Sequence, residues 1–521
     1  LSRGLGDVYK RQDLQRAIKA WLSENRGWLV ILDNLENVDT ILPYLPDKIN
    51  GQILITTRNT RLDYGTPFLL NVFDLNEALI FMKKRLSNTN ECKMEYYKYK
   101  DFSEKSTVLI KRLGYLPLAL EQAAAYIKEV RCSISDYLEL LNQSSVDAFS
   151  DKYASPEYYT SIVTSTWNIS FAALEDSSQQ LLNLCAYMGA DNIPVNFFAE
   201  MRDLLPDPLK NALSKQLTLN RVVTGLRTYS LASGTVEYIN IHRLVQEVIR
   251  KHLEIEEGNN SGVNRWLQLD FNMLESYLPT SCEEAYGVSQ FMPIAIHAES
   301  IADHYSILVK TKSLKLIIAN LYDKIGDRYD DCGIFDNAFR NYSSSLHIKE
   351  LYLGKKHSET AIQYDNIGLL YTRTGDYLEA VKWHKKAIHI LESSLGKKSL
   401  DTATAYNNLG LALVKNGDYD KGISWYQKCI DIELKILGDD HIELAADYNN
   451  MGEAYHQKHD EESALKYLKL ALEIKEKQIG CMNSNIAITY NNLGSVYWRL
   501  KQYDNACLLY TSPSPRDKRQ S

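Results

Sequence analysis

Two short apolar runs near the N-terminus each end in a side chain that could contact a nucleotide. Trp28-Leu-Val-Ile-Leu-Asp33 places an acid at the end of an expected buried parallel strand. Gly51-Gln-Ile-Leu-Ile-Thr-Thr-Arg58 places an arginine at the end of a second one. An aspartate there can hold Mg²⁺ through water beside a nucleotide, and an arginine can reach the terminal phosphate. Either residue could instead only cap a helix or close a turn.

The C-terminal third shows a strict internal period. Tyrosines and glycines recur every 42 residues, at Tyr322, Tyr364, Tyr406, Tyr448 and Tyr490, and at Gly326, Gly368, Gly410, Gly452 and Gly494. Each unit has the pattern of two helices, with a turn such as Asn416-Gly417-Asp418 between them and a second helix from Tyr419 to just before Gly438. One helix pair cannot bury its apolar face alone, so we expect the units to stack into an α-solenoid.

The expected first helices carry rows of asparagine just before the periodic glycine. These residues are Asn366, Asn407, Asn408, Asn449, Asn450, Asn491 and Asn492. We expect the first helices to line the concave side of the stack. An asparagine offers both a donor and an acceptor, so this face could bind the backbone of a protein partner or extended peptide. The alternative is that some asparagines only bridge neighbouring helices. Arg373, Lys415 and Arg499 could add charge contacts or belong to a solvated face.

The repeats resemble the tetratricopeptide repeat in the 42-residue form of kinesin light chains. The resemblance is carried by YNNLG, by GDY and a later alanine, and by a G-x-x-H link such as Gly438 to His441. It covers about five units, from Asn320 to Cys507, and it implies a protein or peptide ligand on the concave face. His459 and Lys501 depart from it, since they stand where the turn glycine is expected.

The N-terminal half resembles the NB-ARC family, which are signalling ATPases of the STAND class. The motifs are the strand ending in Leu-Asp-Asn, the strand ending in Thr-Thr-Arg, and Leu113-Gly-Tyr-Leu-Pro-Leu-Ala-Leu-Glu121. The resemblance makes Asp33 the Walker B magnesium ligand and catalytic residue, and Arg58 a sensor of the γ-phosphate. It places Pro117 against adenine, although a proline is equally expected as the first residue of a helix.

A histidine further along resembles another motif of this family. Ile241-His-Arg-Leu-Val-Gln246 is similar to the MHD motif, which makes His242 a contact of the ADP β-phosphate. Arg243 replaces the usual aspartate of that motif. The alternative for His242 is an ordinary histidine before an amphipathic helix.

Two features of the sequence limit nucleotide chemistry. Asn34 stands where relatives carry a second acid, and an amide cannot accept a proton, so hydrolysis is expected to be slow or absent. The sequence contains no G-x-x-x-x-G-K-[ST] loop, which the resemblance places upstream of Asp33. We expect an internal fragment that binds ADP or ATP with Mg²⁺ weakly or not at all, and a longer parent protein that binds them well and could be an ATPase.

The predicted fold class is mostly α, with part of an α/β nucleotide-binding core. The expected organisation is adaptor-like sequence at 1–12, the nucleotide-binding core at 13–73, a helical domain at 74–150, a winged-helix-like domain at 151–255, leading helices at 256–319, repeats at 320–509 and a second adaptor-like segment at 510–521. Within the winged-helix-like domain, we expect wing strands at 225–231 and 235–239.

Composition narrows the classes of partner. The chain has 521 residues, 59 Lys and Arg against 66 Asp and Glu, and a net charge of −7, which disfavours nucleic acid. Its eight cysteines form no CxxC pair, so we expect neither a zinc site nor disulfides, and a cytoplasmic location. No 18-residue apolar run indicates a membrane span.

Three functions follow from these patterns. The first is a nucleotide-dependent signalling switch or scaffold that binds proteins through its repeats and could form a homo-oligomer. The second is a non-hydrolysing adaptor with a degenerate nucleotide domain. The third is a transcription regulator, which the charge balance disfavours.

Overall fold

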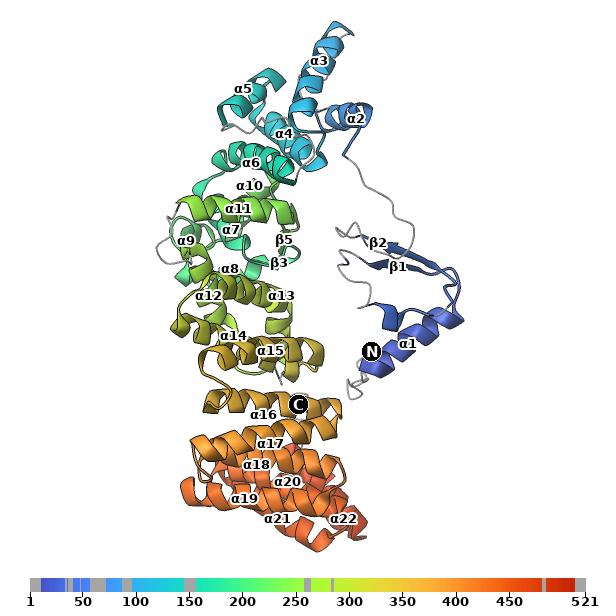
Figure 1. Cartoon of the computed structure of the whole chain (residues 1–521), viewed down its shortest axis with the longest axis vertical. Coiled ribbons are helices and arrows are strands. Elements are labelled where there is room, and N and C mark those ends of the chain that lie inside the picture. The colour runs from blue at the N-terminus through green and yellow to red at the C-terminus, as the bar shows by residue number, and fades with distance from the viewer. Residues whose placement is uncertain are drawn as a thin grey trace. The chain divides into compact units, whose positions relative to one another are not determined.

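The computed structural model describes residues 11–32, 35, 41–46, 48–56, 72–86, 96–144, 156–256, 264–282, 285–479 and 484–510. The chain divides into two compact units, Leu1–Val72 and Phe73–Ser521. Figure 1 shows their elements. Asp33, Asn34 and Arg58 lie outside the described residues.

The first unit contains a short parallel sheet. Its elements are α1 (Arg11–Glu24), β1 (Leu29–Leu32), the 3₁₀ helix η2 (Leu42–Tyr44) and β2 (Gln52–Ile55). The two strands pair in parallel from Leu29 opposite Gln52 to Leu32 opposite Ile55, as expected.

The expectation that both strands are buried is wrong in the described part of this unit. One face of the sheet packs on a small cluster from α1, β1 and the η2 region, in which Trp28 is buried. On the other face, Leu29, Ile31 and Leu54 are 58%, 61% and 54% exposed. An apolar run predicts burial on both faces, but here α1 and η2 cover only one.

The second unit begins with four helices. They are α2 (Leu75–Leu86), α3 (Tyr96–Arg112), α4 (Pro117–Val130) and α5 (Ile134–Ser144). Helix α4 starts at a proline. Proline has no backbone N–H, and in the first turn of a helix that N–H would have no partner within the helix. Its buried Ala119, Ala123 and Ile127 recur at helical spacing, and α4 packs on α2.

Helices and a small antiparallel sheet follow. They are α6 (Pro156–Ala172), α7 (Asp176–Cys185), β3 (Ile193–Pro194), α8 (Val195–Glu200), η3 (Arg202–Leu204), α9 (Leu209–Ala212), α10 (Gln216–Thr228), β4 (Ser233–Gly234), β5 (Tyr238–Asn240) and α11 (Arg243–Glu256). The strand order is β3-β5-β4. The strand predicted at 225–231 is wrong, because α10 continues to Thr228. Leu219, Val222 and Leu226 are buried at helical spacing and hold this segment as a helix.

Two helices connect this part to the repeats. They are α12 (Arg265–Tyr277) and α13 (Ala285–Leu308). Trp266, Phe271 and Phe291 are buried, as expected of core residues. They belong to one continuous cluster of buried side chains that extends from Trp167 to Leu370. The α6–α11 module, the connecting helices and the first repeats therefore share a core.

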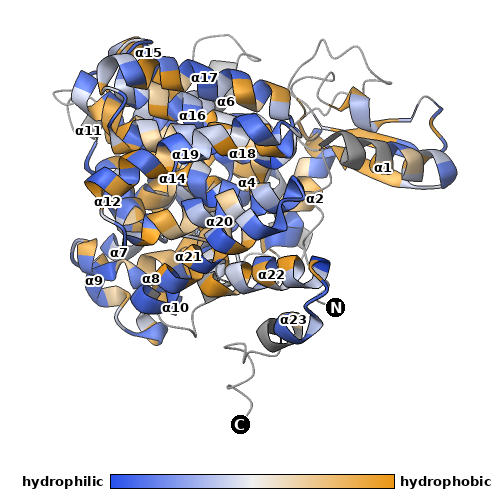
Figure 2. Ribbon diagram, turned by 90° about the horizontal axis from the view of Figure 1, so that it is seen from below, coloured by the Kyte–Doolittle hydropathy of each residue, from blue (hydrophilic) through white to orange (hydrophobic). Residues whose placement is uncertain are grey.

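The C-terminal part is a stack of helix pairs, as predicted. Its helices are α14 (Lys312–Asp331), α15 (Phe335–Tyr352), α16 (Ser358–Thr374), α17 (Tyr377–Ser394), α18 (Leu400–Lys415), α19 (Tyr419–Ile436), α20 (Ile442–Gln457), α21 (Glu461–Ile479), α22 (Ser484–Arg499) and α23 (Tyr503–Tyr510). Apolar and polar residues alternate around their turns (Figure 2), as expected of helices with one buried face.

The periodic glycines allow the two helices of a pair to approach closely. A Cβ on Gly368 would lie 2.8 Å from the ring of His384, and one on Gly410 would lie 2.8 Å from the ring of Tyr426. Each contacting side chain comes 16 residues after its glycine, on the second helix. A larger residue has no room there, which explains the 42-residue period in physical terms.

The turns inside the pairs require a left-handed backbone. Gly375 and Gly417 have φ of 83° and 90°. His459 and Lys501 take the same conformation, with φ of 68° and 59°. A side chain in this region costs backbone strain, so these two departures keep the turn geometry at some cost in stability.

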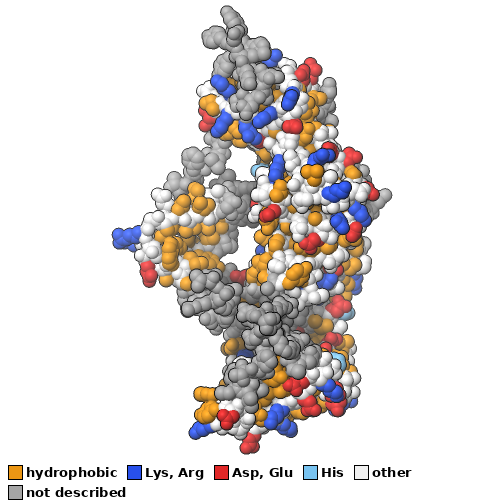
Figure 3. All heavy atoms as spheres, turned by 180° about the vertical axis from the view of Figure 1, so that it is seen from behind, with side chains coloured by type: hydrophobic (Ala, Val, Ile, Leu, Met, Phe, Trp, Pro, Cys, Tyr) orange, Lys and Arg blue, Asp and Glu red, His pale blue; other side chains and the backbone are white. Residues whose placement is uncertain are grey.

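The surface carries mixed charge. On the face in Figure 3, Lys and Arg are interspersed with Asp and Glu. Within the part of the chain that the structure describes, no helix combines the length and apolar character that a bilayer crossing needs.

Candidate functional site

The first helices of successive repeats lie next to one another. Helix α16 contacts α18, α18 contacts α20, and α20 contacts α22. In a stack of helix pairs, such contacts belong to the inner side of the curve. The predicted asparagines lie on these helices.

The asparagines form hydrogen bonds from one repeat to the previous one. Asn408 Nδ2 donates to Asp365 Oδ2 over 2.7 Å. Asn450 Nδ2 donates to Asn407 Oδ1, and Asn492 Nδ2 donates to Asn449 Oδ1, over 3.2 Å each. Donor and acceptor are 43 residues apart in every case. Five of the seven predicted asparagines therefore bridge neighbouring helices. This is the alternative role that the sequence left open for them.

Bridging does not use up the hydrogen-bonding capacity of these amides. Each donor amide keeps a second N–H and its own oxygen, because an asparagine can make about four hydrogen bonds. Asn408, Asn450 and Asn492 are half-buried, so part of each remains accessible, whereas Asn449 is buried. Among the described residues, the side chains of Asn366 and Asn491 have no hydrogen-bond partner.

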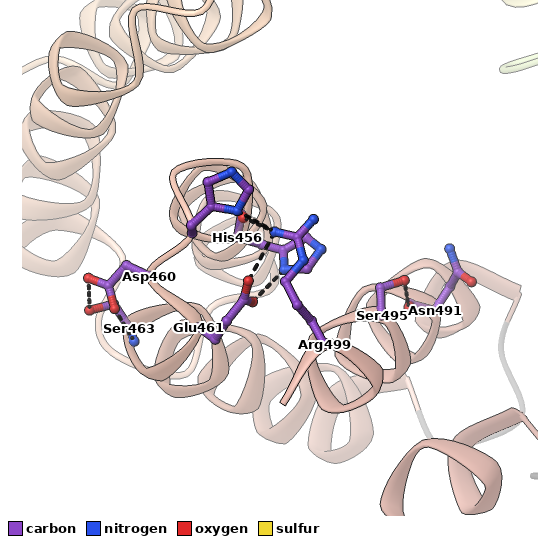
Figure 4. Close-up of polar contacts among 8 residues, drawn as sticks. His456, Asp460, Glu461, Ser463, Asn491, Ser495 and Arg499 are labelled. Carbon is purple, nitrogen blue, oxygen red and sulfur yellow. Dashed lines mark hydrogen bonds and ion pairs between the residues drawn. The ribbon is translucent and has the colours of Figure 1, made fainter. Parts of the chain in front are cut away.

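The basic residues near the ends of the first helices connect repeats. Arg373 pairs with Asp330 over 3.4 Å, and Lys415 pairs with Glu453 over 2.8 Å. Arg499 Nη1 lies 3.0 Å from Glu461 Oε1 and donates to the carbonyl of His456 over 2.9 Å. Figure 4 shows this cluster, with Asn491 projecting separately from α22. These cations mainly hold neighbouring repeats together.

Three of the periodic tyrosines also have a structural partner. Tyr364 donates to Glu350 over 2.5 Å, Tyr406 to Glu392 over 2.6 Å and Tyr490 to Glu476 over 2.7 Å. Burial raises the pKa of the Tyr406 hydroxyl, and Glu392 raises it further, so it stays a donor. The sequence contains a sign of these tyrosine–glutamate pairs, because each glutamate precedes its tyrosine by 14 residues.

The histidine of the G-x-x-H link is a helix cap. His357 Nδ1 accepts from the N–H of Glu359 over 3.2 Å, and His441 Nδ1 accepts from the N–H of Glu443 over 3.4 Å. Ser399 occupies the same place before α18 and accepts from the N–H of Thr402. A side-chain acceptor there satisfies an N–H of the first helical turn.

His242 has the same geometry. It is exposed, and its Nδ1 accepts from the N–H of Leu244 over 3.2 Å at the start of α11. This arrangement fits the ordinary histidine before a helix, and a contact with ADP stays a prediction. Pro117 is the exposed first residue of α4, and its contact with adenine also stays a prediction.

Three family models match the chain. Residues 318–393 and 401–477 match one model described as tetratricopeptide repeat, and residues 487–511 match another. The C-terminal repeats are tetratricopeptide repeats. Such repeats form extended surfaces that bind other proteins. Residues 169–258, which include most of α6–α11, match a "Domain of unknown function (DUF7779)".

One curated relative is similar over much of the chain. The chain is 26% identical over 390 residues to a "Nucleotide-binding leucine-rich repeat (NLR)-like protein" from Hyaloscypha variabilis. The alignment covers 67% of this chain and 36% of that protein. The chain thus spans about a third of the length of this relative.

The chain is also similar to solved structures. BtubC (BKLC) from P. vanneervenii is 21% identical, with a TM-score of 0.35, and the match covers 43% of this chain and 86% of that one. A Signal Transduction ATPase with Numerous Domains protein with a tetratricopeptide repeat sensor, from Pyrococcus horikoshii, is 16% identical with a TM-score of 0.36. That match covers 97% of this chain and 70% of the other. With TM-scores this low, the repeat assignment depends on the family models and the helix geometry.

Proposed function

We propose that this chain is part of a nucleotide-dependent signalling scaffold in the cytoplasm. Its tetratricopeptide repeats bind a protein partner, and its N-terminal half responds to ADP or ATP. ADP favours a closed form, and a ligand on the repeats favours an open, ATP-bound form that oligomerises. A ligand shifts such an equilibrium only by its difference in affinity for the two states. The similarity to an NLR-like protein supports this arrangement.

The partner half of the proposal is carried by the asparagine ladder, which we define as Asn366, Asn407, Asn408, Asn449, Asn450, Asn491 and Asn492. Inter-repeat hydrogen bonds fix the orientation of three donor amides before any ligand arrives. The remaining N–H and oxygen of each are available to a peptide backbone. A pre-ordered set of donors and acceptors lowers the entropy that binding costs. An extended segment of a partner protein is the ligand that fits.

The shared core supports communication between the repeats and the α6–α11 module. Buried side chains are continuous from the α6–α11 module through α12 and α13 into the first repeats. Packed interiors transmit strain because they contain little free volume. A ligand that changes the stacking of the first repeats can therefore bias the module that precedes them.

The nucleotide half depends on the order of three sequence motifs and on the parallel pair β1 and β2. These strands end opposite each other, at Leu32 and Ile55. Asp33 directly follows the first strand, and Arg58 follows the second after two threonines. In parallel sheets, ligands bind beyond the carboxyl ends of the strands.

Selection of random extended peptides by phage display tests the partner half. We expect peptides that bind the chain to lose affinity when Asn366→Ala and Asn491→Ala are combined, because neither side chain bridges repeats. Gln427→Ala is the matched control, since this exposed side chain on the second helix α19 bonds only Asp431 within its own helix. Equal binding to the double variant and the control would exclude the ladder as the binding face.

ATP turnover by a longer chain that includes the expected phosphate loop tests the nucleotide half. Asp33→Ala should remove turnover, since the aspartate would hold Mg²⁺. Turnover that is the same with and without this substitution would refute the role of Asp33.

A non-hydrolysing adaptor is the second candidate, and Asn34 favours it. An amide in place of an acid cannot accept a proton from water. Nucleotide binding without turnover in the longer chain, together with peptide binding to the repeats, would support the adaptor.

A further inference from the structure

Three side chains that can bind metal meet between two repeats, apart from the asparagine ladder. Cys429 and Glu433 lie one turn apart on α19, and Asp447 lies on α20 of the next repeat. Cys429 Sγ is 3.0 Å from Asp447 Oδ2 and 3.5 Å from Glu433 Oε1. The ligand atoms all lie within 4.8 Å of one another. The three residues are 0%, 6% and 4% exposed.

The charge of this cluster is not balanced by its protein neighbours. Glu433 Oε2 is buried, and it has no hydrogen-bond partner among the described residues. Asp447 Oδ2 faces the Cys429 thiol, and the Cys429, Glu433 and Asp447 ligand atoms all lie within 4.8 Å of one another. The groups that Asp447 meets in this cluster are therefore themselves acidic. A buried carboxylate without a compensating charge is costly, so the cluster must hold either a proton or a cation.

The residues at the equivalent place in the neighbouring repeats differ from Glu433 in charge. Residues 42 positions before and after Glu433 are Leu391 and Lys475, and the one before Leu391 is Lys349. Lys349 Nζ contacts Asp323 Oδ2 over 2.5 Å and Gln363 Oε1 over 3.4 Å. Lys475 Nζ donates to Thr489 over 3.0 Å. The equivalent place is thus a buried ammonium at Lys349, a half-buried ammonium at Lys475 and an apolar side chain at Leu391.

At the α19–α20 interface, an acid replaces the ammonium and a second acid faces it. Asp447 is the equivalent of Gln363 and Thr489. Cys429 stands where other repeats have Ser345, Ala387 and Ala471. The α19–α20 interface therefore has no lysine at the place of Lys349 and Lys475, and it has three side chains that can bind a metal ion.

We propose that Cys429, Glu433 and Asp447 bind a divalent transition-metal ion, with Zn²⁺ as the best fit. A thiolate selects Zn²⁺ over Mg²⁺ and Ca²⁺, which prefer oxygen ligands. Ligand atoms at about 2.1–2.3 Å from zinc in tetrahedral geometry lie roughly 3.6 Å apart, a separation that the cluster reaches with small side-chain rotations. Water takes the fourth position, and the thiol and carboxyl protons are released when the ion binds. The ion links α19 of one repeat to α20 of the next.

Cysteine spacing does not mark this site. Its ligands come from two repeats and include one cysteine, so no CxxC pair marks it. The expectation of no zinc site in this chain was based on such pairs alone.

Cobalt titration tests the proposal. The whole chain, stripped of metal with a chelator, is titrated with Co²⁺ while the thiolate-to-cobalt charge-transfer absorption is recorded. We expect a band that saturates at one Co²⁺ per chain and disappears when Zn²⁺ is added. Zn²⁺ should also raise the unfolding temperature of the repeats.

Two variants test the metal ligands with residues that other repeats have at the equivalent positions. Cys429→Ala copies Ala387 and Ala471, and Glu433→Lys copies Lys349 and Lys475 and supplies the missing cation internally. Each should weaken Co²⁺ binding by about 100-fold or more, since even groups that only orient a metal ligand contribute roughly 10–100-fold. Circular dichroism of both should match the parent.

Cys332→Ser is the matched control. Cys332 is half-buried at the end of α14, so its removal should leave the cobalt band and the zinc effect unchanged. The proposal fails if the parent shows no band at one equivalent of Co²⁺, or if either variant keeps the affinity of the parent.

Discussion

Asn408 donates a hydrogen bond of 2.7 Å to the carboxylate of Asp365 in the preceding repeat. The other oxygen of this carboxylate lies 2.6 Å from Nδ1 of the buried His384. One buried acid thus connects α16, α17 and α18. We expect Asn408→Ala to lower the local stability of these helices by about 1.5–3 kcal/mol, because the lost bond involves a charged acceptor. Hydrogen exchange of the α16 and α18 amides measures this change.

Asn366→Ala is the comparison for this variant. The same type of side chain is removed from the equivalent place one repeat earlier, where it has no described hydrogen-bond partner. We expect a change within about 0.5 kcal/mol. Equal losses for the two variants would show that the bond to Asp365 contributes nothing.

The tyrosine–glutamate pairs offer a second comparison within the repeats. Tyr406→Phe removes the 2.6 Å hydrogen bond to the partly exposed Glu392 and should cost about 1 kcal/mol. At Tyr448 the residue 14 positions earlier is Leu434, and the Tyr448 hydroxyl has no hydrogen-bond partner among the described residues. Tyr448→Phe should therefore be nearly neutral. Thermal unfolding of the two variants distinguishes them, and a larger loss for Tyr448→Phe would contradict the assignment.

Much of the repeat architecture could be predicted from the sequence because its period comes from local packing. The glycines mark the close approach of the paired helices, and Gly417 marks the left-handed turn, so the limits of α19 followed directly. The role of the asparagines could not be decided, since one amide can both bridge repeats and bind a ligand. Asn408 and Asn366 are asparagines at the same position of successive repeats. Asn408 has a hydrogen-bond partner in the preceding repeat, whereas Asn366 has none among the described residues.

Other features depended on contacts that no local pattern records. The segment 225–231 contains the β-favouring residues of a strand, but the buried face of α10 holds its first part as a helix. The run Trp28–Leu32 predicted a buried strand, whereas only one face of the sheet is covered. In both cases tertiary packing decided the outcome. The cluster at Cys429 was visible only by comparing Glu433 with Lys349 and Lys475 across the period.

The close approach at Gly410 predicts a third result. Gly410→Ala places a methyl group 2.8 Å from the Tyr426 ring and 3.2 Å from the carbonyl oxygen of Gly422. Neither helix can move away without loosening the pair, so we expect a loss of about 1–3 kcal/mol. Thr404→Ala on the exposed side of the same helix is the control and should be neutral or slightly stabilising, since alanine favours helices. Urea unfolding followed by circular dichroism compares them, and a neutral Gly410→Ala would refute the steric explanation of the period.

Asp270 on α12 predicts how stability depends on pH. Its side chain is fully buried, and neither carboxylate oxygen has a hydrogen-bond partner among the described residues. Burial raises its pKa well above the ordinary value of 3.8. The folded chain therefore binds the Asp270 proton more tightly than the unfolded chain. This contribution to stability is complete below pH 3.8 and is lost as the pH rises through the raised pKa, at up to about 1.4 kcal/mol per pH unit.

Asn cannot ionise, so Asp270→Asn should remove this dependence. We expect the variant and the parent to have similar stability near pH 4, because both then bury a neutral polar group. At pH 8 the variant should be more stable, since it avoids burying a charge without a partner. Calorimetric unfolding temperatures of both proteins between pH 4 and pH 8 measure the difference, in which the other titrating groups cancel. A variant that is less stable than the parent by the same amount at every pH would show that Asp270 instead has a partner in the folded protein.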